Sequence, residues 1–323
     1  MTSCFDPKLN VNFTCHDSDD FREQCVGWDV EHFQLAPGNY KIGVEMIHTQ
    51  NIQLSNVSHL VGVLERGLTP NGTNVVTLPL ILDSDPLYYC GRMVDKDECP
   101  AAISGENYET NSSGGINYVS IAVDADLLNR EAVQLTGKPY ASLVQQQRVG
   151  IRYRDQRRLA QSVTTCMSKL GNRAEPLLVW QQQLLEKQII EQFPLFICPP
   201  SGTDVKIPDR RAIAWKAEQV IMKNLSHRLT IEQLCNLVGC SSRTLHLGFK
   251  ERYGTTPGHY ARMVALNAVR RQLRNLSQHR TLTDVAMDMG FYHLGRFSQQ
   301  YKELFAELPS VTVAKSRKDN GRT

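Results

Sequence analysis

The sequence contains no run of about 18 apolar residues, and it does not open on a basic segment followed by an apolar one. We therefore expect no membrane association and no secretory signal, and we expect a cytoplasmic protein. Of the 323 residues, 41% are hydrophobic and 21% are charged. This composition is typical of a globular chain with about two domains and not of a disordered one.

Motifs that support catalysis or cofactor binding are also missing. The chain has no GxxxxGK phosphate loop and no GxSxG nucleophile turn. It has no His-x-His pair, and His32, His48 and His59 are too scattered to predict a metal-dependent enzyme. We therefore expect no enzymatic activity, no cofactor and no metal ion.

The nine cysteines are an odd number and include no CxxC pair. They therefore predict neither a disulfide framework nor a zinc site. We expect reduced, mostly buried thiols. A redox or metal sensor built from these cysteines is the alternative.

The overall charge of +3 conceals a division along the chain. Residues 209–323 carry 19 Lys and Arg against 9 Asp and Glu, a net charge of +10, whereas residues 1–208 carry 17 against 24, a net charge of −7. Lysine and arginine neutralise phosphate groups. We therefore expect only the C-terminal part to bind a polyanion.

Short apolar runs separated by turn residues fill about residues 26–123, as in KIGVEMIHT after PGN and NVVTLPLIL after TPNG. About six to eight such strands predict an antiparallel barrel or sandwich whose interior could hold a small molecule. The aromatic residues Trp28, Tyr88 and Tyr89 are candidates for the lining of a ligand pocket. Their alternative place is the hydrophobic core.

The pattern lengthens in about residues 124–193, where 152–170 and 176–193 are two helix-length stretches. The second stretch carries apolar residues on one helical face at Leu178, Leu185, Ile189 and Phe193. The two helices could form a homodimer interface within residues 152–193, or they could simply pack on their own domain.

Four prolines and a glycine within residues 194–209 predict a linker. It would separate a sensory and dimerisation domain, residues 1–193, from a helical domain, residues 210–323. The change from strand to helix patterns therefore coincides with the change in charge.

The helical part repeats itself with a period of 51 to 52 residues. TIEQLCNLVG begins at Thr230, and TLTDVAMDMG begins at Thr281. Each copy opens with a threonine that can cap a helix, carries Gln233 or Asp284 three residues later, and then reaches a glycine. Each copy is predicted to be one short helix followed by a tight turn.

A second helix follows each turn, and its apolar residues also match. Leu245 and Phe249 in the first copy correspond to Phe297 and Tyr301 in the second. The pattern predicts two helix-turn-helix units, about residues 230–252 and 281–304. Between them, Pro257 to Asn275 predicts one helix of about 28 Å, which could hold the two units about one DNA turn apart.

The residues that would read bases lie opposite the buried face of each second helix. Arginine and glutamine can chelate guanine and adenine, and leucine can contact the thymine methyl group. A solvated surface or a phosphate contact is the alternative for each of them. The candidates are Ser242, Arg243, His246, Leu247, His293, Leu294, Arg296 and Gln299, and the candidates for phosphate contact are Lys250, Arg270, Arg271 and Arg274.

Two stretches of this region, SSRTLHLGFKERYGTTPGHYARMVALNAVRRQL and DVAMDMGFYHLGRFSQQYKELFAELPS, resemble the DNA-binding domain of the AraC/XylS family of bacterial transcription regulators. The resemblance is closest to the XylS and ethanolamine-operon-activator branch. It covers about residues 210–315. Leu247 departs from the family, which often has arginine there, so we expect specificity to depend more on Arg243.

The resemblance implies an α+β architecture with a cupin-like antiparallel β-barrel, a helical dimerisation hairpin, and an all-α domain of seven helices with tandem helix-turn-helix units. It also implies a nucleoid-associated bacterial activator that binds promoter DNA and recruits RNA polymerase when a small-molecule effector is bound. Two alternatives remain: control by a partner protein, and fusion to a DNA-repair alkyl acceptor. Dispersed cysteines argue against the second.

Overall fold

The computed structural model describes residues 5–7, 9–25, 27–80, 86–145, 147–170, 177–190, 209–276 and 280–320. Contacts divide the chain into two compact units. One holds most residues up to 205, and the other holds residues 206–323 with the short segments 33–40 and 61–64. The predicted linker lies outside the described residues except for its last residue, which begins a helix.

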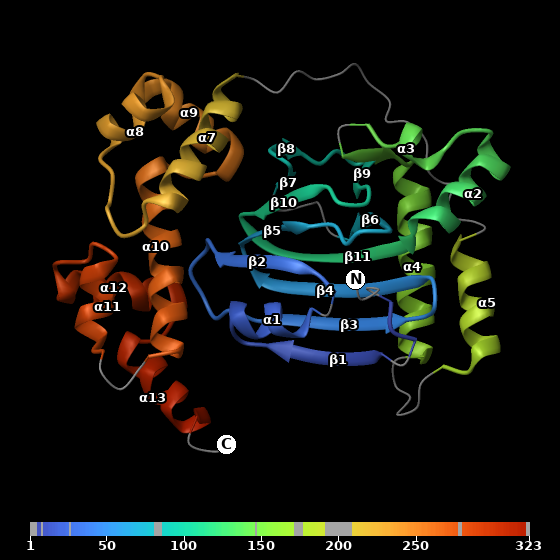
Figure 1. Cartoon of the computed structure of the whole chain (residues 1–323), viewed down its shortest axis with the longest axis horizontal. Helices are drawn as coiled ribbons and strands as arrows, with labels where there is room; N and C mark the ends of the chain where they lie inside the picture. Colours follow the sequence, from blue (N-terminus) through green and yellow to red (C-terminus); the bar gives the residue numbers. More distant parts are fainter. Residues whose placement is uncertain are drawn as a thin grey trace. The chain divides into compact units, whose positions relative to one another are not determined.

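The N-terminal unit contains two β-sheets (Figure 1). Neighbouring strands, such as β3 with β4 and β6 with β11, pair in antiparallel orientation. Seven strands form the first sheet, in the order β1 (Asn10–Cys15), β3 (Ile42–His48), β4 (Ile52–Val61), β11 (Gly114–Asp124), β6 (Thr73–Pro79), β9 (Glu98–Ala102) and β12 (Arg148–Gly150). Five form the second, in the order β2 (Asp29–Gln34), β5 (Val63–Leu68), β10 (Asn107–Ser112), β7 (Leu87–Tyr89) and β8 (Arg92–Met93).

These pairings confirm the α+β class, with antiparallel sheets followed by a helical domain. Each sheet keeps two edge strands, β1 and β12 in the first and β2 and β8 in the second. The described strands therefore form two open sheets, and no pairing among them closes a barrel.

The N-terminal unit also contains helices, and side-chain caps fix the start of two of them. Asp17 caps α1 (Ser18–Gln24), and Asp124 caps α2 (Ala125–Thr136) by accepting a hydrogen bond from the Leu127 amide. The short α3 (Tyr140–Leu143) follows. In α4 (Tyr153–Leu170) one face is buried in the same apolar core as β6 and β11, through Leu159, Val163 and Met167.

The second helix of the predicted hairpin is α5 (Val179–Ile190), three residues shorter at its start than expected. Leu185 and Ile189 are buried in the core of the N-terminal unit, Leu178 precedes the helix and is exposed, and Phe193 lies outside the described residues. Glu186 accepts hydrogen bonds from the Asn51 amide and side chain, both at 2.9 Å. The helix therefore packs on its own domain.

None of the helices that the structure describes combines the length and apolar character that crossing a bilayer would require.

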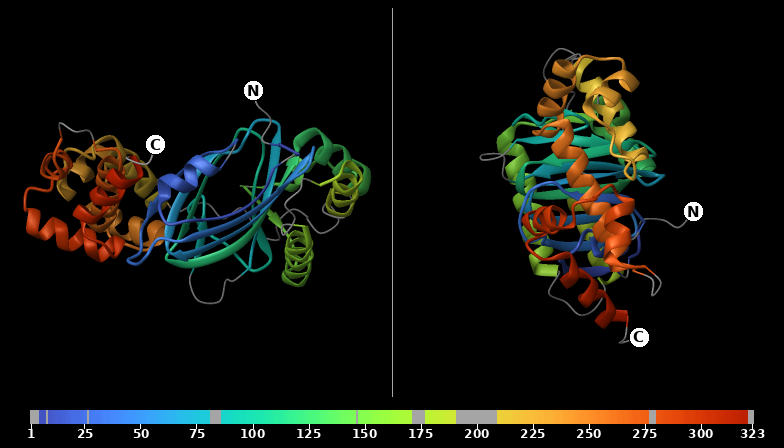
Figure 2. Two further views of the ribbon diagram at one scale, coloured as in Figure 1. Left: turned by 90° about the horizontal axis from the view of Figure 1, so that it is seen from below. Right: turned by 90° about the vertical axis from the view of Figure 1, so that its left-hand side faces the viewer.

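Seven helices are described in the C-terminal unit (Figure 1). The repeat appears as two matched helix pairs, and α10 runs between them through the middle of the domain (Figures 1 and 2). The helices are α7 (Asp209–Lys223), α8 (Ile231–Val238), α9 (Ser242–Tyr253), α10 (Pro257–Arg274), α11 (Leu282–Asp288), α12 (Leu294–Phe305) and α13 (Pro309–Asn320).

The apolar residues of the repeat form the core of this unit. Leu245 and Phe249 on α9 and Phe297 and Tyr301 on α12 are all buried, and they share one cluster. Each second helix thus turns its i and i+4 residues inward, as the sequence predicted. The opposite faces of α9 and α12 are left exposed.

Candidate nucleic-acid interface and internal cavity

Side-chain caps fix the start of the first helix-turn-helix unit. Thr230 Oγ1 accepts a hydrogen bond from the Gln233 amide at 3.1 Å, and Gln233 Oε1 accepts one from the Thr230 amide at 2.9 Å. The helix α8 ends at Gly239, whose φ of +71° is readily adopted only by glycine. Ser241 then caps α9 by accepting from the Thr244 amide at 3.2 Å.

The second unit repeats this arrangement with one difference. Thr281 and Asp284 form the same reciprocal pair, with amide to side-chain distances of 3.1 and 2.8 Å. The turn again contains a left-handed glycine, Gly290, with a φ of +73°. The residue that caps α12 is His293, which makes no side-chain capping hydrogen bond. Its imidazole therefore stands at the exposed start of the second helix.

All eight predicted base-reading residues are exposed, and they occupy the first turns of α9 and α12 or the residue just before α12. In helix-turn-helix proteins the N-terminal residues of the second helix contact base edges. The His246 ring is fixed against its own helix, because Nδ1 lies 2.8 Å from the Ser242 carbonyl oxygen. Gln299 donates to Glu303 at 3.0 Å, so it must exchange that partner for a base.

The four predicted phosphate contacts differ in their surroundings. Lys250 is exposed, whereas Arg271 and Arg274 are half-buried. Arg270 forms an ion pair with Glu307 at 3.0 Å and lies over the Phe305 ring at 4.7 Å. Its side chain is only 13% exposed. Because its guanidinium has these partners inside the domain, Arg270 would have to exchange them for a phosphate, and its phosphate contact stays a prediction.

Glu307 joins α10 to the last helix, since it also accepts hydrogen bonds from Thr312 and Lys315. Burial alone would raise the pKa of this carboxyl group. The hydrogen bonds from Lys315 and Thr312 and the charge of Arg270 outweigh burial and hold the pKa below its usual value. The carboxylate therefore stays ionised at neutral pH and keeps Arg270 in place.

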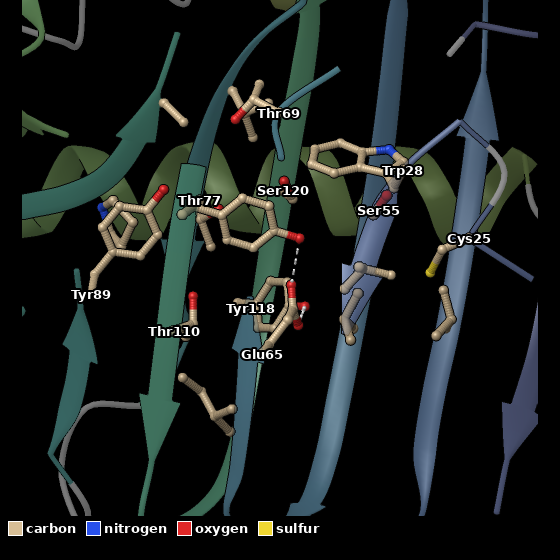
Figure 3. A pocket seen from close by; sticks show the side chains of 18 of the residues that line it. Cys25, Trp28, Ser55, Glu65, Thr69, Thr77, Tyr89, Thr110, Tyr118 and Ser120 are labelled. Atoms are coloured by element: carbon tan, nitrogen blue, oxygen red, sulfur yellow. Dashed lines mark hydrogen bonds between the residues drawn. The ribbon is translucent and has the colours of Figure 1, made fainter. Parts of the chain in front are cut away.

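A cavity lies within the N-terminal unit, lined by both sheets (Figure 3). Its volume is about 90 Å³, room for several water-sized groups. Every second residue of the lining strands faces it, as in Val44 and Met46 on β3 and Ser55 and Val57 on β4. Trp28 and Tyr89, two of the three aromatic candidates from the sequence, are among the residues that line the cavity.

Tyr88 is not among the described residues that line the cavity. Its neighbours Leu87 and Tyr89 on β7 both face inward. Successive side chains of a strand point to opposite faces, so Tyr88 must face away. Of the three aromatic candidates from the sequence, Tyr88 is therefore the one that does not face this cavity.

A carboxyl group, Glu65 on β5, contributes to the cavity wall (Figure 3). Its Oε2 atom lies 2.8 Å from His32 Nε2 and accepts a hydrogen bond from the Tyr118 hydroxyl at 3.3 Å. Its Oε1 atom accepts one from the Tyr108 hydroxyl at 3.1 Å. Only 13% of the Glu65 side chain is exposed. This network corresponds to no motif in the sequence, although the acidic Glu65, two residues after the apolar Val63 and on the same face of the strand, was a usable signal.

Comparison with known proteins matches residues 234–315 to a family model described as a helix-turn-helix domain. An XylDLEGF operon transcriptional activator 2 from Pseudomonas putida is 42% identical over 97 residues, which cover 30% of this chain and 62% of that protein. A second XylDLEGF operon transcriptional activator from Pseudomonas putida is 39% identical over 102 residues, 31% of this chain and 32% of that protein. The chain therefore matches about a third of the length of that relative.

Among solved structures, a probable AraC family transcriptional regulator from Rhodopseudomonas palustris is 31% identical, with a TM-score of 0.31. The match covers 32% of this chain and 97% of that one. Through its C-terminal domain the chain belongs to the AraC/XylS family of transcription regulators. In AraC/XylS terms, α8 and α9 form the first helix-turn-helix unit and α11 and α12 the second.

The matched part of the AraC/XylS domain begins at Leu234 and ends in α13. It contains the eight predicted base-reading residues. The cavity and its Glu65 network lie outside the matched residues. What the N-terminal unit does must therefore be argued from its own geometry.

Proposed function

We propose that the protein is a sequence-specific, DNA-binding transcriptional activator. This proposal rests on two helix-turn-helix units. The first helix of each begins with a side-chain capping box, and the second helix of each exposes polar residues near its N-terminus. Each second helix enters one major groove, and the two grooves are successive ones on promoter DNA. The net charge of +10 on residues 209–323 supports binding to phosphate.

We further propose that the N-terminal unit controls this activity by binding a small-molecule effector in its cavity. The half-buried Trp28 and Tyr89 and the Glu65 network line one internal space, which supports a ligand site. Recruitment of RNA polymerase would follow effector binding. Control by a partner protein is the second candidate, and co-purification of a small molecule with the full chain would argue against it.

A DNA-binding titration tests the main proposal. A site is first recovered from a random duplex library with the full chain. Arg296→Ala should relax the preference at one base pair by about 1 to 3 kcal/mol, because one arginine reads one guanine. Arg271→Ala should weaken binding to all DNA sequences alike. It should also reduce the slope of the logarithm of the binding constant against the logarithm of salt concentration by about one. Arg157→Ala, on α4, removes the same charge outside the domain and should change neither.

Binding that is absent, or that does not weaken with salt, would contradict the proposal. If Arg296→Ala and the unaltered chain have the same base preference, only the proposed base contact of Arg296 is contradicted. The two results are separable because one concerns any duplex and the other a single base pair.

The α4 and α5 region is the proposed homodimer interface. Several apolar side chains stay exposed there in the single chain: Leu178, Val179, Trp180 and Leu184. Trp180→Glu should shift the protein toward the monomer in sedimentation at micromolar concentration. Val133→Glu on α2, which is also exposed, is the matched control and should leave the mass unchanged.

A further inference from the structure

Glu65 is the one side chain with a full charge among the described residues that line the cavity. The remaining lining residues are apolar, aromatic, hydroxyl-bearing, an amide and a thiol, and they include no lysine, arginine or histidine. Burial of the Cys25 thiol raises its pKa, so this side chain is neutral as well. Glu65 is therefore the one described lining residue whose full charge a bound molecule would contact, and its partner His32, 2.8 Å away, is not part of the lining.

The carboxylate is ionised and has capacity for another donor. Burial alone would raise the pKa of Glu65, but the charge of His32 and its hydrogen bond outweigh burial, and the pKa lies below its usual value. A carboxylate has about four acceptor positions. Two donors lie at Oε2 and one at Oε1. One acceptor position on Oε1 therefore remains for a donor in the cavity.

Aromatic rings surround this carboxylate. Trp28 and Tyr108 meet edge to face with ring centroids 6.2 Å apart, and Tyr89 and Tyr118 also line the wall (Figure 3). Burial raises the pKa of the Tyr89 and Tyr108 hydroxyls, so both rings stay neutral. Faces of electron-rich rings attract a cation, most strongly where water is excluded.

Much of the remaining lining is hydrocarbon. This hydrocarbon part consists of Val30, Val44, Met46, Val57, Val75 and Ile116. An aliphatic or aromatic body fits this surface, whereas a sugar or a nucleotide would leave several polar groups without partners. A second negative charge would be repelled by Glu65 in an environment that screens it poorly.

We propose that the cavity selects a small hydrophobic primary amine, whose ammonium group donates to Glu65 Oε1 between the aromatic rings, and that it rejects carboxylates. This inference rests on the proposed role of the cavity as the effector site. It adds the chemical class of the effector and the residue that selects it.

Calorimetric titration of the full chain with three probes of one shape tests the inference. Benzylamine is a cation at neutral pH, benzyl alcohol is neutral, and benzoate is an anion. We expect benzylamine to bind about ten- to a hundredfold more tightly than benzyl alcohol, because a hydrogen bond to a charged group is the stronger one. Benzoate should bind more weakly than both.

Glu65→Gln keeps the shape of the side chain and removes the charge, so it should bring benzylamine and benzyl alcohol to within about threefold of each other. Glu45→Gln is the matched control, because Glu45 lies between the lining residues Val44 and Met46 on β3 and so faces away from the cavity. It should keep the full preference. Tyr89→Leu leaves the hydrogen bonds of Glu65 with His32, Tyr108 and Tyr118 intact. It should reduce benzylamine affinity about three- to tenfold relative to the alcohol.

Three results would overturn the inference: benzoate that binds as tightly as benzylamine, an amine preference that survives Glu65→Gln, and failure of benzylamine to bind at millimolar concentration. If Glu65→Gln does not fold, the inference is tested by the order of affinity of the three probes for the unaltered chain and by the effect of Tyr89→Leu on that order. DNA binding is measured on the same samples. If the unaltered chain binds DNA but shows no preference for the amine, the inference alone is rejected. If the unaltered chain does not bind DNA, the proposed function is rejected.

Discussion

A single glycine sets how closely two helices of the DNA-binding domain approach. At Gly248 on α9, a Cβ atom would lie 2.1 Å from the carbonyl oxygen of Arg210 on α7 and 3.2 Å from Ala214 Cβ. A backbone atom cannot move aside as a flexible side chain can. Gly248→Ala should therefore lower the free energy of unfolding of this domain by about 1 to 3 kcal/mol, through overpacking. Urea unfolding of the full chain, followed by helical circular dichroism, measures it.

Gly258 on α10 is the matched control, because no atom lies within 4 Å of a Cβ built there. Gly258→Ala should leave stability unchanged or raise it by up to about 1 kcal/mol, since alanine favours helix. A stability of Gly248→Ala equal to that of Gly258→Ala would show that α7 and α9 do not pack as closely as described.

Two buried histidines make the N-terminal unit sensitive to acid. Burial and the neighbouring His32 lower the pKa of His59 to about 3, and burial lowers that of His48 to about 4. An unfolded histidine titrates near 6.5. The unfolded chain therefore binds more protons below that pH, so the stabilisation is complete above about pH 6.5 and is lost as the pH falls toward the folded values. Each histidine should cost about 2 kcal/mol between pH 7 and pH 5.

Replacement of His59 by a ring that does not titrate checks this expectation. His59 stacks between His32 and Tyr118, with centroids 5.5 and 5.7 Å away, and His59→Phe keeps a ring there. It should remove about half of the stability change between pH 7 and pH 5, measured from urea midpoints of the β-sheet signal. The exposed His16 is the control, and His16→Gln should leave the pH dependence as it was. An unchanged pH dependence in His59→Phe would show that His59 is already charged in the fold.

At the scale of elements, local caps define the short first helices of both helix-turn-helix units. Thr281 Oγ1 accepts from the Asp284 amide at 3.1 Å and begins α11, which has only seven residues. So short a helix gains little from its own backbone hydrogen bonds. Thr281→Ala should lower the free energy of unfolding by about 1 kcal/mol. Thr281→Ser keeps the hydroxyl, so its unfolding midpoint should stay close to that of the unaltered chain, and a midpoint as low as that of Thr281→Ala would reject the cap.

The same caps explain which elements could be predicted from the sequence. Thr230 and Gln233 at the start of α8 and Gly239 at its end lie in one short stretch of the sequence, so their pattern alone located this helix. The strands could also be recognised, because their alternation is local. The cavity could not, because Glu65, His32 and Tyr118 come from three strands or strand ends whose pairing depends on the whole fold. The ion pair of Arg270 could not be predicted for the same reason, since its partner Glu307 is distant in sequence.

At the scale of the whole DNA-binding domain, α10 sets the distance between the two reading helices. Its 18 residues span about 27 Å at 1.5 Å per residue. Its inward side is buried through Tyr260, Val264, Val269 and Leu273, and it contacts α7, α9, α11 and α13. A helix packed on so many neighbours cannot bend without losing apolar burial. The spacing of the two recognised half-sites on DNA should therefore be fixed.

Insertions between the half-sites of a selected duplex test this rigidity. Five added base pairs turn one half-site to the far side of the duplex, because a full turn takes about 10 base pairs. Affinity should then fall toward that of non-specific DNA, typically about a thousandfold or more below that of the specific site. Ten added base pairs restore the face but add about 34 Å, which a stiff α10 cannot span, so binding should stay weak. Recovery with ten added pairs but not five would mean that the two units are joined flexibly, and the helix would then have no part in choosing the site.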